Sequence, residues 1–394
     1  MDPIALLQDF VAIPSVNPMG RDLVGEEYLE TKMSAYLVAL FQRENIPFEA
    51  VAIAPGRTNL LARCDNPASK ITVLMDAHQD TVPVDGMVIP PYDPRIEGGK
   101  LCGRGSCDIK GGGAAMLAAF LRLVKEKPKD RANVVMSFTV DEEATSLGID
   151  HLVAEMTSPK SAYRLLPHPP DISVVAEPTM LDIVVAHRGA VRWQIHTAGR
   201  ACHSSRPQDG VNAIYRMAKV VSLMEQFATT LPGSKPAHRL CGPATLSVGL
   251  IAGGLSVNVV PDQCVIDIDR RVIPGETSEA VIADIHHYLK ERLDFEFTFS
   301  PPFVCSPALD DNLNGPWSDA MLTSIAKSVG PKQKIGVAYG THASRIAAAG
   351  FPAFVFGPGD IAQAHTKDEW VDVEQVQQAA EIYYQFCRDA AQGV

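Results

Sequence analysis

Two hydrophobic patterns alternate along the first half of the chain. Apolar residues recur at helical spacing over 26–44, and the stretch 111–126 is an Ala- and Leu-rich helical pattern. Three short and almost wholly apolar runs, 71–75, 134–140 and 172–175, are typical of buried strands. Because helices alternate with buried strands, we expect an α/β domain in which helices pack over a largely parallel sheet.

The pattern changes about halfway along the chain. The expected order becomes strand, helix, strand, strand, helix, at 191–196, 212–227, 245–251, 264–269 and 279–293. This order is typical of an inserted α+β module of the split βαβ kind. A buried strand at 353–356 and a helix at 373–390 then resume the first pattern. We therefore predict a first domain made of residues 1–186 and 299–394, interrupted by a second domain over 187–298.

Composition and charge exclude several classes of function. At 394 residues, the chain exceeds what one hydrophobic core usually supports, which agrees with two domains. A net charge of −11 argues against nucleic-acid binding, because neutralising phosphates requires clustered Lys and Arg. No apolar run approaches the roughly 20 residues of a membrane span, and the amino terminus is typical of an amphipathic helix rather than a signal peptide. Eight scattered cysteines without a CxxC pair predict reduced thiols and a cytoplasmic protein.

Acid and imidazole side chains follow the three expected strands of the first half. The first strand is followed by His78 and Asp80, the second by Glu142 and Glu143, and the third by Glu177. Ligands in open α/β sheets gather beyond the carboxyl ends of the strands, so the three motifs point to one place.

Two further segments complete a set of metal-binding side chains. Asp108 lies in the glycine-rich stretch 105–112, and His365 supplies a late imidazole. Hard divalent metals prefer carboxylate oxygen and imidazole nitrogen, and two ions need about five protein ligands with at least one shared. Each motif alone has a plainer explanation, such as a chance His-x-Asp or a solvated acidic turn at 141–143. The glycines at 111–113 could hold a phosphate at a helix start, but the Walker pattern is absent.

Over essentially its whole length, the chain resembles the M20 family of dinuclear zinc amidohydrolases and exopeptidases. The motifs above carry the resemblance together, and segments 337–341 and 357–369 resemble the acetylornithine deacetylase branch, with succinyl-diaminopimelate desuccinylase as its near alternative. The resemblance implies a zinc-peptidase-like α/β catalytic domain, with helices on both faces of a mixed sheet. It implies that a ferredoxin-like lid or dimerisation domain interrupts this domain, and that the protein forms a homodimer through the lid.

The same resemblance implies two Zn²⁺ ions, for which Co²⁺ can substitute. Asp108 would bridge the two ions. His78 and Glu177 would complete one site, and Glu143 and His365 would complete the other.

The resemblance makes Glu142 the general base and Asp80 the residue that orients the His78 ring. Both roles also agree with the residues themselves. A ligating His commonly gives its other ring N–H to a carboxylate, and Asp80 lies two residues away on the same side of an extended segment. Adjacent Glu142 and Glu143 cannot both point one way, so one can bind metal while the other removes a proton from water.

Three positions in the predicted lid resemble residues that act on the substrate. His203, in segment 199–207, resembles a His that reaches a neighbouring protomer's active site and stabilises the oxyanion. Asn258 and Arg271 resemble substrate-anchoring positions, and the fork of an Arg suits a carboxylate. Arg270 is the rival candidate for that role. The plainer alternatives are a structural His at a turn and an ion pair on the lid surface.

The implied reaction is hydrolysis of the amide bond in N-acyl amino acids, as in acetylornithine deacetylase. Desuccinylase or glutamate-carboxypeptidase-like exopeptidase specificity is the alternative within the enzyme class, and a noncatalytic metal-binding homologue is the alternative outside it. Two departures bear on this choice. Cys107 stands beside Asp108 where relatives carry a small or hydroxyl residue, and we expect it to be a buried packing residue. His342 replaces an acid, and if that acid recognises a substrate amine, ornithine becomes a weaker candidate.

Overall fold

The computed structural model describes residues 1–393, which divide into two compact units. Unit 1 contains Met1–Val185, Asp311–Ile335 and the chain from Thr341 onward. Unit 2 contains Ala186–Asp310 and Gly336–Gly340. It extends beyond the predicted limit at 298 because two short strands at 297–299 and 304–306 pair with the first strand of that unit.

An eight-stranded mixed sheet forms the centre of unit 1. In order across the sheet, its strands are β1 (Phe48–Ala54), β2 (Arg57–Cys64), β6 (Asn133–Thr139), β3 (Thr72–His78), β7 (Ile172–Val175), β15 (Ala353–Val355), β8 (Ile183–His187) and β14 (Lys334–Val337). The four strands β6, β3, β7 and β15 are parallel, and antiparallel strands flank them. In this register His78 pairs with Thr139 and Asp76 with Val175, so the carboxyl ends of β6, β3 and β7 meet at one edge.

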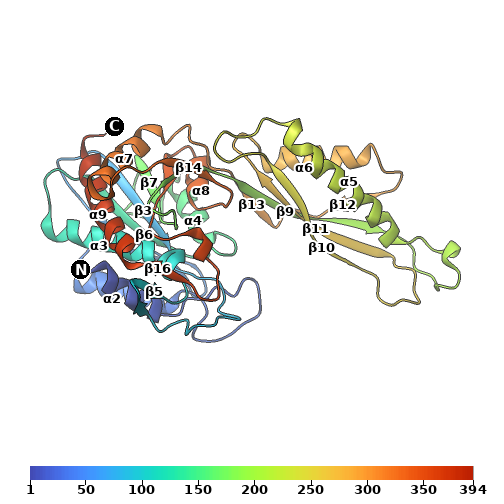
Figure 1. Ribbon diagram of the computed structural model, residues 1–394, viewed down its shortest axis with the longest axis horizontal. Coiled ribbons are helices and arrows are strands. Elements are labelled where there is room, and N and C mark those ends of the chain that lie inside the picture. Colours follow the sequence, from blue (N-terminus) through green and yellow to red (C-terminus); the bar gives the residue numbers. More distant parts are fainter. Residues whose placement is uncertain (394) are drawn as a thin grey trace. The chain divides into compact units, whose positions relative to one another are not determined.

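Helices cover both faces of this sheet. They are α1 (Pro3–Ala12), α2 (Thr31–Arg43), α3 (Gly111–Glu126), α4 (Leu147–Met156), α7 (Gly315–Val329), α8 (Ala343–Ala348) and α9 (Val373–Asp389). In Figure 1, α3, α7 and α9 lie on one side of β3, β6 and β7, and α4 and α8 lie on the other. A small sheet of β16 (Trp370–Asp372), β5 (Lys100–Cys102) and β4 (Arg95–Glu97) lies beside them. The predicted α/β class is confirmed.

Unit 2 is an antiparallel sheet with two helices on one face. Its elements are β9 (Gly189–Ala198), α5 (Ala213–Ser234), β10 (Thr245–Gly253), β11 (Gln263–Val272), α6 (Ser278–Lys290), β12 (Phe297–Phe299) and β13 (Val304–Ser306). Strand order is β10-β11-β9-β12, and β13 also pairs with β9. Alternate residues Val191, Trp193 and Ile195 of β9 enter the core shared with both helices, and this alternation made the strand predictable. The predicted strand-helix-strand-strand-helix order is confirmed.

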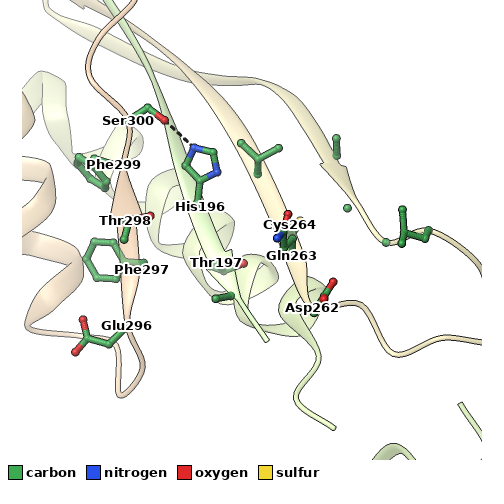
Figure 2. Close-up of a pocket in the computed structure, with 16 residues that line it drawn as sticks. His196, Thr197, Asp262, Gln263, Cys264, Glu296, Phe297, Thr298, Phe299 and Ser300 are labelled. Carbon is green, nitrogen blue, oxygen red and sulfur yellow. Dashed lines mark hydrogen bonds between the residues drawn. The ribbon is translucent and has the colours of Figure 1, made fainter. Parts of the chain in front are cut away.

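The sheet of unit 2 also lines a hollow, which Figure 2 shows. The hollow has a volume of about 900 Å³ and is lined by residues of β9, β10, β11, β12 and their loops. A hydrogen bond within it joins His196 Nε2 and Ser300 Oγ, 2.7 Å apart. Within the described chain, none of the acid and imidazole groups that could hold a metal ion lines this hollow.

Within residues 1–393, no helix combines the length and the apolar character needed to cross a membrane. All eight cysteines carry free thiols, as predicted.

Candidate metal centre

The carboxyl edge of the parallel strands gathers the predicted acids and imidazoles of unit 1. His78 is the last residue of β3, Glu142 and Glu143 follow β6, and Glu177 follows β7. Since these three strands are neighbours, the sheet register alone brings the three motifs together. Ligand atoms of His78, Asp108 and Glu143 lie within 4.8 Å of one another.

Asp108 lies between two imidazoles, one on each of its oxygens. Its Oδ1 is 3.3 Å from Nε2 of His78, and its Oδ2 is 3.3 Å from Nε2 of His365. His365 Nε2 is also 3.1 Å from Oε2 of Glu143. A carboxylate whose two oxygens face different ligand groups has the geometry of a bridging ligand between two ions.

Glu369 holds the turn that presents Asp108. Its buried carboxylate accepts hydrogen bonds from the backbone N–H groups of Gly105, Cys107 and Asp108, at 2.8, 2.9 and 3.0 Å. It also pairs with Arg104 at 2.7 Å. Glu369 could not be predicted from the sequence, because its partners lie some 260 residues earlier in the chain.

Glu177 is buried among the other acids of the cluster. Burial raises its pKa well above the ordinary value, and the charges of Asp108 and Glu142 raise it further. Burial also raises the pKa of Glu143 to about 8, with Asp108 again as the repelling neighbour. Among the described residues, the side chains that oppose these charges are the imidazoles of His78, His342 and His365. The protein therefore concentrates more negative charge here than its own cations balance.

Two buried polar atoms of the cluster make no well-directed hydrogen bond. They are Nε2 of His78, despite its 3.3 Å contact with Asp108, and Oε1 of Glu143. An unpartnered buried polar atom costs about 1–3 kcal/mol, which a coordinated cation would offset. Unpartnered nitrogen and oxygen, excess buried carboxylate and a two-sided Asp108 together fit a pair of divalent cations.

Asp80 connects the His78 ring to the acidic turn after β6. Nδ1 of His78 is 2.9 Å from the backbone oxygen of Asp80 and 3.5 Å from its carboxylate. The hydrogen bond that orients the ring therefore goes to the main chain, and Nε2 is left free for a ligand. The carboxylate instead accepts the backbone N–H groups of Glu142 and Glu143, both at 3.1 Å.

His342 pairs with a buried acid close to His78. Its Nδ1 is 2.9 Å from Oδ2 of Asp76, a buried residue of β3 that also accepts hydrogen bonds from Ser137 and Thr139. The rings of His342 and His78 meet edge to face, with centroids 6.3 Å apart. Asp76 was not predicted, although an acid in an otherwise apolar strand is a signal that the sequence contains.

Cys107 is a buried thiol whose surroundings do not favour metal binding. Its Sγ donates a hydrogen bond to the backbone oxygen of Asp360, 3.3 Å away. Burial raises the pKa of the thiol, so the neutral form predominates, and a neutral thiol is a poor metal ligand. These contacts agree with the packing role that we expected.

The three lid candidates belong to unit 2. His203 and Asn258 are exposed and close together, because Ser204 N donates to the backbone oxygen of Asn258 at 3.0 Å. Arg271 pairs with Asp269 at 2.8 Å on the half-exposed side of β11. Arg270 is instead buried against Glu276, at 2.7 Å, so the rival candidate is held in a structural ion pair.

Comparisons with known proteins agree with this geometry. The family model for peptidase family M20/M25/M40 matches residues 74–389. An acetylornithine deacetylase of Photorhabdus laumondii is 30% identical over 94% of this chain and 92% of its own length. A protein named as a probable carboxypeptidase of Aspergillus clavatus is 28% identical over 95% of this chain and 86% of its own length.

Solved structures support the same fold. The aminopeptidase PepT of Bacillus cereus superposes with a TM-score of 0.74 at 21% identity, covering 98% of both chains. An M20 family metallo-carboxypeptidase of Sulfolobus solfataricus gives 0.75 at 17% identity, covering 98% of this chain and 99% of its own. With the family model matching most of the length, the chain belongs to the M20/M25/M40 peptidase family and is a hydrolase of its metallopeptidase and amidohydrolase class.

Proposed function

We propose that this protein is a dinuclear zinc-dependent hydrolase that cleaves the amide bond of N-acyl amino acids. In this proposal His78 and Glu177 would hold one ion, Glu143 and His365 would hold the other, and Asp108 would be shared between them. The placement of Asp108, 3.3 Å from each imidazole, is the observation that carries the proposal. Cobalt, which accepts the same nitrogen and oxygen ligands, would substitute.

Each protein group has a role beside the ions. When bound, the ions supply Lewis-acid polarisation of the scissile carbonyl and make a water molecule more acidic. Glu142 takes the proton from the attacking water and returns it to the leaving amine. Burial raises the pKa of this carboxyl, which makes it a stronger base than an exposed Glu. As part of this proposal, His203 would donate to the oxyanion in a neighbouring protomer's site, and Asn258 and Arg271 would anchor the substrate.

Different observations favour different acyl groups and amino acids in the substrate. The full-length relatives named acetylornithine deacetylase favour an N-acetylated amino acid. The carboxypeptidase-named relative and His342, in place of an acid, favour a substrate without a second amine, as in glutamate-carboxypeptidase-like cleavage. Retention of Glu142 beside five metal-binding side chains argues against a noncatalytic homologue.

The partner that fits unit 2 is a second copy of the chain. Strand β10 ends the sheet, and Leu250 and Ile251 on it are 67% and 60% exposed. The neighbouring Leu255 and Val257 are almost fully exposed. An apolar sheet edge of this kind is usually covered in the working protein. We propose a homodimer through this edge, working in the cytoplasm, where free thiols persist.

A panel of amides tests the proposed reaction. The zinc-loaded protein should hydrolyse N-acetyl amino acids with kcat/KM in the enzymatic range, on the order of 10⁴ M⁻¹s⁻¹ or more for the preferred one. Initial rates are compared for N-acetylornithine, neutral and acidic N-acetyl amino acids, N-succinyl-diaminopimelate and dipeptides ending in Glu. Preference for substrates with a second carboxylate would select the alternative specificity. No turnover of any amide would reject the proposal.

Substituting the base should separate catalysis from metal binding. We expect Glu142→Gln to lower kcat by roughly 10²–10⁴-fold, because no carboxylate remains to accept the proton. It should still bind two zinc ions per chain, measured by metal analysis after dialysis. The adjacent Glu143→Gln is the matched control, and it should lose metal. Full turnover in Glu142→Gln would remove this residue from the role of base.

Zinc should stabilise the protein more at pH 8 than at pH 5. In the metal-free fold the pKa of Glu143 is raised from 4.5 to about 8. The protonated group therefore contributes its full share of the free energy of unfolding below pH 4.5, and this contribution is lost as the pH rises through 8. Zinc needs the deprotonated carboxylate, so its binding competes with the proton at low pH. At a free zinc concentration of 100 times Kd, each bound ion adds about 2.7 kcal/mol to the free energy of unfolding. Thermal melts with and without zinc measure the shift; equal shifts at both pH values would contradict this assignment.

A charge on the apolar edge should break the dimer. Leu250→Asp places a carboxylate on β10, and sedimentation equilibrium should then give the monomer mass. Val88→Asp, at a 74% exposed apolar position of unit 1, is the control and should leave the mass unchanged. A dimer that survives Leu250→Asp would place the interface elsewhere. A monomeric unmodified protein would exclude the dimer.

A further inference from the structure

A buried amide joins two carboxylates behind the acidic turn. Asn17, in the loop between α1 and α2, is fully buried. Its Nδ2 donates one hydrogen to Oδ2 of Asp80 and the other to Oδ1 of Asp141, both at 2.8 Å. Ionised carboxylates only accept, so the NH₂ group must face them, and the orientation of the amide is determined. Its oxygen accepts from the backbone N–H of Met19 at 3.0 Å and from Nη2 of Arg57 at 3.4 Å.

The two carboxylates held by Asn17 control the backbone around Glu142. Asp80 accepts the N–H groups of Glu142 and Glu143, both at 3.1 Å. Asp141 immediately precedes Glu142 and has a φ of +63°, in the left-handed region. Asp is among the few residues besides Gly that adopt this region, and left-handed residues of this kind are common in tight turns.

The charges around Asn17 explain why an amide is needed. Arg57 pairs with Glu30 and with Asp141, the latter at 2.9 Å. Glu30 also accepts the backbone N–H of Asp141 at 3.2 Å. One guanidinium thus faces two acids and none of its hydrogen bonds reaches Asp80. Without the amide, the carboxylates of Asp80 and Asp141 would lose their shared donor and repel each other in a buried space.

We infer that Asn17 is a positioning residue for Glu142, and that it acts by holding Asp80 and Asp141 in the arrangement that orients the turn 141–145. This inference rests on the proposed function, because Glu142 is the base only in that proposal. It gives the Asp80 carboxylate a second task besides its place beside His78. Asn17 itself touches neither the proposed ligands nor the reacting atoms, so it is not a catalytic residue.

Two matched substitutions test the inference. Asn17→Ala removes two donated amide hydrogen bonds of 2.8 Å and the two that its oxygen accepts from Met19 and Arg57. Asn314→Ala removes two donated bonds of 2.9 Å, to backbone oxygens of Val185 and Ala353 in the same unit. Both variants should lose thermal stability, and Asn17→Ala should lose at least as much as Asn314→Ala. Only Asn17→Ala should lower kcat, by roughly 10²-fold, because a base displaced by about 1 Å loses its alignment. KM should stay within about threefold, and zinc stoichiometry should stay at two.

A second measurement is independent of turnover. In the metal-free protein, backbone hydrogen exchange over 141–146 should be faster in Asn17→Ala than in the unmodified chain, and unchanged in Asn314→Ala. If no substrate is hydrolysed, the proposed function fails, and exchange alone decides whether Asn17 holds the turn. Unchanged exchange, or a loss of kcat equal to that of Asn314→Ala, would overturn the inference. Rescue of kcat by Asn17→Gln but not by the isosteric Asn17→Asp would identify the donated hydrogens as the cause.

Discussion

Buried negative charge at one sheet edge is the constraint on which the rest of this structure depends. Asp108, Glu143 and Glu177 lie together with few protein cations, and burial pushes the carboxyl groups of the two glutamates towards the neutral form. Such a cluster is costly unless something positive completes it. The folded state therefore carries a local free-energy cost at this cluster. The strands and turns that carry the acids hold them in place.

The parallel register explains how residues remote in sequence arrive at that edge. β6, β3 and β7 are adjacent and end together, so one geometric rule places His78, Glu142 and Glu177. Asp108 reaches the same place because α3 begins there, and Glu369 fixes the turn before it. His365 enters last, after the chain has passed through unit 2 and returned to the first sheet.

The sequence was informative wherever a pattern was local. Helix 111–126 and strand 172–175 were predicted with the bounds that the structure has, because their apolar periodicity is strong and their ends carry clear signals. The β1–β2 hairpin was not predicted, since β1 is only half-buried and its composition is shared by loops and helices. Among site residues, strand-end acids were predictable. Asn17 and Asp76 were not, because their partners are more than 60 residues away and polar residues of this kind are usually exposed.

Separate sets of hydrogen bonds support the side chains that would hold ions and the turn that carries Glu142. The side chains that would hold ions are supported by backbone groups and by Glu369, whereas the turn carrying Glu142 is supported by Asp80. Asp80 belongs to both sets, since its backbone oxygen orients His78 while its carboxylate holds the turn. A displacement of either set would therefore be transmitted through one buried residue. That coupling gives the fully buried amide opposite Asp80 a physical reason, because it fixes the side chain that contacts both the His78 ring and the turn carrying Glu142.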